Sequence, residues 1–151
     1  MIAVATKRPT LKFWNTKTNK QRNQTDELID KNPALLAVLT FASWYAWRAW
    51  QKKLTITSVW REHVDPNGMH QDWRAVDCRV YDAGRDGVAE KGAEPEITAS
   101  EWQELCAAIN KTFSYGRTWL GRKTDVAIYR NGGSRNEPAP HVHIQTKKRS
   151  W

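Results

Sequence analysis

The sequence predicts an α+β fold in which a small antiparallel sheet packs against two main helices. Two segments carry apolar residues at helical spacing, and four shorter segments are rich in β-branched residues. Turn-forming residues separate these segments. The 151 residues suit one domain with a modest core. We therefore expect a basic N-terminal arm over residues 1–31 and one folded domain over residues 32–151.

The first predicted element is a helix that runs from Asn32 to about Gln51. Asn is a favourable helix cap, and Pro33 suits the first helical position. The preceding residues 1–24 are basic and polar, so we expect a loosely held extension. Three apolar residues of this extension can anchor it to the body: Leu11, Phe13 and Trp14. The apolar stripe of the helix consists of Leu35, Leu36, Leu39, Ala42, Ser43, Ala46 and Trp50.

Two strands are predicted next, over residues 54–60 and 75–81. The loop between them contains a strong turn signal at residues 65–68 and delivers His70 at its tip. Alternate residues of a strand share a face, so Asp77 lies on the face opposite Cys78. We expect Cys78 to be buried packing. The Asp77 face also carries Ala75, Arg79 and Tyr81.

A second helix and two further strands complete the predicted domain. Thr98 and Glu101 form a capping box that begins the helix. The last strands cover residues 125–129 and 141–146, and a Gly-rich turn between them favours antiparallel pairing. The buried face of the helix consists of Trp102, Leu105, Cys106, Ile109 and Phe113.

The chain is strongly basic, with a net charge of +8 and a pI near 9.7. Such a charge favours a polyanionic partner, namely nucleic acid, an anionic membrane or an acidic wall polymer. The basic residues lie mainly in the termini and no nucleic-acid reader motif is visible, so we expect no nucleic-acid partner. The most apolar segment, residues 34–47, is shorter than a membrane span. We expect a monomer with no membrane span.

Three side chains can together hold one zinc ion: His70, Asp77 and His143. Three protein ligands with an open fourth position are typical of a hydrolytic zinc site. His141 and His143 are two apart on a strand and therefore share a face. If that face is also the Asp77 face, the sheet carries the zinc ligands. The alternative is two ordinary half-buried histidines and a salt-bridged aspartate.

A hydrolytic site also needs a base and groups that hold the substrate. His141 and Glu137 are the two candidates to accept a proton from metal-bound water. Arg61 can hold a substrate carboxylate or stabilise an oxyanion, with a plain salt bridge as the alternative. His63 is a substrate contact or an exposed loop histidine. Trp73 is a cleft wall or part of the core.

The chain resembles a group of zinc peptidases over residues 32–146. The group contains D-alanyl-D-alanine peptidases, phage L-alanyl-D-glutamate endopeptidases, lysostaphin-like enzymes and the hedgehog signalling domain. Its D-Ala-D-Ala branch has the pattern Ser-x-His-x-x-Gly-x-Ala-x-Asp after a strand that ends in Arg. Residues 56–61 resemble that strand, and His70, Ala75 and Asp77 match the pattern. Two residues depart from it: Gly68 replaces Ser, and Trp73 replaces Gly.

The resemblance implies that zinc is the cofactor and that His70, Asp77 and His143 are its ligands. Glu137, six residues before His143, matches the hedgehog-type arrangement. Phage endopeptidases often place their base three residues before the last ligand, where this chain has Pro140. Their base therefore cannot be transferred, and Glu137 or His141 remains.

The resemblance further implies hydrolysis of a peptide bond in bacterial peptidoglycan, as in a phage or prophage endolysin. No signal-peptide pattern opens the sequence, so we expect synthesis in the cytoplasm. The enzyme would then reach the cell wall through a separate permeabilising protein. A hedgehog-like module that binds zinc and a partner without turnover is the alternative.

Overall fold

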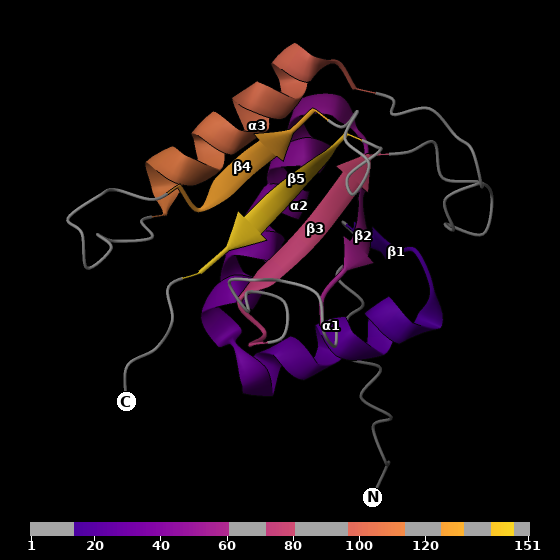
Figure 1. Ribbon diagram of the computed structural model, residues 1–151. Coiled ribbons are helices and arrows are strands. Elements are labelled where there is room, and N and C mark those ends of the chain that lie inside the picture. Colours follow the sequence, from indigo (N-terminus) through magenta and orange to yellow (C-terminus); the bar gives the residue numbers. More distant parts are fainter. Residues whose placement is uncertain (1–13, 61–71, 81–96, 114–124, 132–139, 147–151) are drawn as a thin grey trace, which may run out of the picture.

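The computed structural model describes residues 14–60, 72–80, 97–113, 125–131 and 140–146 (Figure 1). These residues form three helices and five strands, which confirms the α+β class. The helices are α1 (Asn19–Lys31), α2 (Pro33–Trp50) and α3 (Ala99–Thr112). The strands are β1 (Trp14–Thr16), β2 (Leu54–Ser58), β3 (Ala75–Val80), β4 (Ala127–Arg130) and β5 (His141–Gln145).

The strands form one sheet in the order β1-β2-β3-β5-β4. Strands β2, β3, β5 and β4 are antiparallel to their neighbours, and β1 adds a parallel edge beside β2. The antiparallel pairing predicted for the last two strands is therefore confirmed. β3 and β5 lie next to each other although residues 81–140 separate them in the sequence. This pairing brings together Asp77 and His143, two residues of the predicted metal site.

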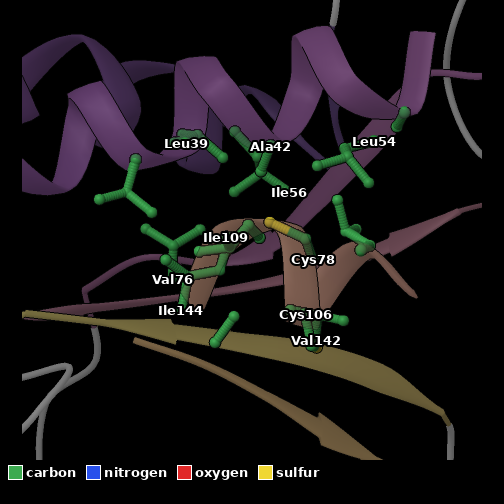
Figure 2. Close-up of a cluster of buried hydrophobic side chains, with 14 of the residues drawn as sticks. Leu39, Ala42, Leu54, Ile56, Val76, Cys78, Cys106, Ile109, Val142 and Ile144 are labelled. Atoms are coloured by element: carbon green, nitrogen blue, oxygen red, sulfur yellow. The ribbon is translucent and has the colours of Figure 1, made fainter. Parts of the chain in front are cut away.

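The core lies between one face of the sheet and the helices (Figure 2). Strand alternation produces this face, since every second residue of β3 and β5 is apolar and buried. In Figure 1, α2 crosses behind the sheet and α3 lies along β4. The two main helices were therefore predicted correctly. Core side chains include Leu39 and Ala42 of α2, Cys106 and Ile109 of α3, and Ile56, Val76, Cys78, Val142 and Ile144 of the sheet.

Both main helices begin at the predicted caps. The Asn32 side chain accepts a hydrogen bond from the Leu35 amide at 3.1 Å, and Pro33 occupies the first turn. Thr98 and Glu101 form both hydrogen bonds of the capping box, at 3.2 and 3.0 Å. Capping satisfies amides that would otherwise lack partners, so local sequence suffices to fix these helix starts. None of the described helices has the combination of length and apolar character that a membrane crossing requires.

Of the loose extension predicted over residues 1–24, the described part, residues 14–24, belongs instead to the folded domain. β1 pairs with β2, and α1 buries Thr25 and Leu28. Leu28 is fully buried and belongs to the core, which holds α1 against the rest of the domain. Trp14 packs against the core, as expected of an anchor, whereas Leu11 and Phe13 lie outside the described residues. The prediction failed because few residues of α1 are apolar, which leaves little helical stripe to detect.

One half-buried amide side chain, that of Asn110, joins α3 to the start of β4. The Asn110 Oδ1 atom accepts hydrogen bonds from the amides of Val126 and Ala127, at 2.8 and 2.9 Å. Its Nδ2 atom donates to the Ala127 carbonyl oxygen at 2.9 Å. Asn110 therefore fixes the position of β4 relative to the helix.

We predict that Asn110→Ala lowers the free energy of unfolding by about 3 kcal/mol, because two part-buried amides and one carbonyl lose their partner. Urea unfolding followed by circular dichroism measures this loss. The matched control is Gln103→Ala, at an exposed position of the same helix, which we expect to change stability by less than about 0.5 kcal/mol. Equal effects of the two substitutions would contradict the role given to Asn110.

Both thiols should be protected in the folded protein. Cys78 and Cys106 are buried, and burial raises both pKa values, that of Cys106 to about 12. The charges of Asp77 and Asp125 add to the respective shifts. We expect no reaction with a thiol reagent at pH 8 until a denaturant unfolds the chain, when both react. Rapid reaction of the native protein would contradict this packing.

The raised pKa of Cys106 also fixes the direction of a pH effect. The folded state holds its proton more tightly than the unfolded state, so this contribution to stability is complete below pH 9. It is lost as the pH rises towards 12.

Candidate metal site

The centre of the site is a direct contact between Asp77 and His143. The two residues are register partners on the adjacent strands β3 and β5. The Nδ1 atom of His143 lies 2.8 Å from the Oδ1 atom of Asp77. The sequence left open whether these residues share one face of the sheet, and the register shows that they do.

The pair is largely shielded from solvent, with 12% of the Asp77 side chain and 13% of the His143 side chain exposed. Attraction between charges is stronger in such an environment than in water, but so is the cost of losing a partner. A carboxylate that accepts a hydrogen bond from Nδ1 also fixes the orientation of the imidazole ring. The contact therefore holds both side chains in a defined geometry.

The two atoms in contact lie closer together than two ligands of one zinc ion would. Two ligands of a tetrahedral zinc ion are separated by about 3.3 Å, given metal–ligand bonds of about 2.0–2.1 Å. A small separation of the two side chains from 2.8 Å would therefore admit the metal. One nitrogen and one carboxylate oxygen also match the ligand types that zinc prefers.

The remaining predicted site residues are only partly within the described structure. His70, Glu137, Arg61 and His63 lie outside the described residues. Among the residues whose positions are described, no group of three His, Cys, Asp or Glu side chains could hold a metal ion. The three-ligand zinc site therefore stays a prediction, of which two members are in contact.

His141 lies on the same strand face as His143, as the alternation of burial along β5 indicates. Its register partner on β4 is Arg130, and its side chain is half-buried. This position is compatible with a role beside the site, and the role of His141 as a base stays a prediction.

Trp73 has a backbone conformation that is unusual for a bulky residue. Its φ angle is 59°, in the left-handed region that glycine adopts without steric cost. The half-buried ring packs against the core and stacks on Trp60, with ring centroids 6.2 Å apart. The Lys31 ammonium lies 5.9 Å from the centre of the Trp73 ring. The Trp73 ring therefore packs partly against the core. Its contact with a substrate stays a prediction.

Asn32 connects the helices to both strands of the site, a role that its cap signal did not reveal. Its Nδ2 group donates to the Trp73 carbonyl oxygen at 3.0 Å and to the Thr146 hydroxyl at 2.8 Å. Trp73 precedes β3 and Thr146 follows β5. One buried side chain thus caps α2 and ties together the ends of the strands that carry Asp77 and His143.

Ser58 is a neighbour of Asp77 that the sequence did not reveal. Simple alternation along β2 places Ser58 on the core face with Leu54 and Ile56. The register shifts between Ile56 and Ser58, however, so that Ser58 becomes the partner of Asp77. A β-bulge of this kind redirects a side chain and leaves no clear signal in the sequence. The resulting row across four strands is Ser58, Asp77, His143 and Ile128.

No family model, no curated protein and no solved structure matches the chain. The roles of the site residues therefore depend on the geometry described above and on the resemblance of the sequence motifs.

We predict that Asn32→Asp destabilises the protein by about 2 kcal/mol, although an aspartate still caps α2. The carboxylate cannot donate to Trp73 or Thr146, so the strand ends lose their connection to the helix. Asn32→Ala should cost more, because it also removes the cap. Denaturant unfolding of both variants measures the two contributions. An Asn32→Asp variant as stable as the unmodified protein would mean that capping is the only role of Asn32.

Proposed function

We propose that this protein is a zinc peptidase that hydrolyses a peptide bond in bacterial peptidoglycan. The observation that carries the proposal is the contact between Asp77 and His143, on adjacent strands and largely shielded from solvent. The motif that contains these residues supplies the substrate class through its resemblance to wall peptidases. We propose His70 as the third ligand.

The bound zinc would lower the pKa of a water molecule and so supply a nucleophile near neutral pH. Asp77 and His143 would fix the position of that ion within the sheet. His141 or Glu137 would accept the proton of the water and transfer it to the leaving amine. Arg61 would hold a carboxylate of the substrate, with His63 and Trp73 as further substrate contacts.

The conformation of Trp73 supports the motif resemblance. The pattern usually has Gly at this position, and the φ angle of 59° is one that Gly adopts easily. The chain therefore keeps a glycine-like backbone at this point of the motif although the residue is Trp. The hydrogen bond from Asn32 to the Trp73 carbonyl group helps to hold that backbone.

The charge of the chain suits the proposed substrate. A net charge of +8 attracts the protein to the anionic polymers of a bacterial wall. We propose an endolysin-like role, in which a separate permeabilising protein gives access to the wall.

We predict that His143→Ala abolishes both zinc binding and the clearing of a peptidoglycan suspension. Loss of a ligand should weaken zinc binding by more than about 100-fold, beyond the effect of removing a group that only orients a ligand. Isothermal titration with zinc and the turbidity of purified peptidoglycan measure the two properties. Ile128→Val is the matched control, since Ile128 is the partner of His143 on β4 and has no metal-binding group.

The same assays separate the candidate roles. His141→Ala should bind zinc but fail to clear the suspension if His141 is the base, and Glu137→Gln should do so if the base is Glu137. If His143→Ala clears the peptidoglycan suspension as fast as the unmodified protein, the proposed peptidase activity is contradicted. Zinc binding without cleavage of any wall peptide would instead favour a hedgehog-like binding module.

A further inference from the structure

Two hydroxyl groups of β2 are buried and have no hydrogen-bond partner in the described structure. They are the Oγ1 atom of Thr55, a fully buried residue, and the Oγ atom of Ser58. A buried polar group without a partner is destabilising, and native proteins contain few of them. Such a group calls for an explanation, which can be a bound water or ion or a functional role.

The register of the sheet decides what each hydroxyl faces. Ser58 is the partner of Asp77, and Thr55 is the partner of Arg79. The bulge before Ser58 also brings the Thr57 hydroxyl to the Asp77 carbonyl oxygen, to which it donates at 3.3 Å. Thr57 of β2 therefore holds the backbone of Asp77. The Ser58 hydroxyl, which has no partner among the described residues, lies on the same side of the sheet as the Asp77 carboxylate.

We propose that Ser58 is a positioning residue for Asp77 when the site holds zinc. This inference rests on the proposed zinc site. The Oδ1 atom of Asp77 contacts the Nδ1 atom of His143 at 2.8 Å. Binding a metal ion between these side chains would break that contact and reorient the carboxylate. The Ser58 hydroxyl would then rotate and donate to the Asp77 carboxylate.

This arrangement follows the general behaviour of metal ligands. Carboxylates that bind metals are themselves hydrogen-bonded, and the groups that orient them increase metal affinity by about 10- to 100-fold. A serine hydroxyl can rotate to suit either state, because only its torsion angles change. Thr55 differs in one respect, since it faces the side chain of Arg79, which cannot be a metal ligand.

The test compares zinc affinity with the stability of the metal-free protein. The probe is zinc alone, titrated against a chromogenic chelator, and stability is measured by thermal unfolding in the presence of a strong chelator. We expect Ser58→Ala to raise the Kd for zinc about 10- to 100-fold and to leave the metal-free melting temperature unchanged or higher. Ser58→Thr, which keeps the hydroxyl, should retain most of the affinity.

Thr55→Val is the matched control, because it removes a hydroxyl that is equally buried and unpartnered on the same strand. We expect its Kd for zinc to stay within about twofold of the unmodified protein, as no ligand is affected. A Kd for Ser58→Ala within the same range would overturn the role of Ser58, even if the unmodified protein binds zinc and cleaves peptidoglycan. A parallel loss of metal-free stability would also overturn it, because that pattern indicates a purely structural residue. Failure of the unmodified protein to bind zinc would overturn the proposed function as well.

Discussion

The register between β3 and β5 is the constraint on which the candidate site depends. It places Asp77 opposite His143. The same register places the neighbouring pair, Val76 and Ile144, opposite each other in the core. A shift by one residue would turn the apolar side chains of a strand out of the core. Burial of the core thus secures the polar contact on the other face of the sheet. The geometry of the site is in this sense a consequence of hydrophobic packing.

The features predicted from sequence were those with local causes. Caps at Asn32 and Thr98 mark the starts of α2 and α3, and alternation along the strands assigns Asp77 and His143 to the polar face. α1 escaped prediction because its contact with the core depends mainly on Leu28, the one buried apolar residue of a mostly polar helix. Ser58 escaped because a bulge changes the face of a side chain without changing the pattern of residue types.

Long-range hydrogen bonds were equally invisible in the sequence. The cap at Asn32 predicts the bond to Leu35, but nothing near it in the chain predicts donation to Trp73 and Thr146. Their positions depend on how the sheet folds against α2. Candidate zinc ligands could be selected by type and spacing because metal chemistry requires particular donor atoms, and they stay a prediction.

The pairing of β1 with β2 has a consequence for the solubility of shortened forms of the protein. A chain that began at residue 32 would lack β1 and would leave β2 as an edge strand. It would also lose Leu28 and so expose apolar surface that α1 now covers. Unpaired backbone groups beside newly exposed apolar side chains favour pairing between molecules and aggregation. By pairing with β2, the short strand β1 therefore reduces the tendency of the sheet to pair with other molecules.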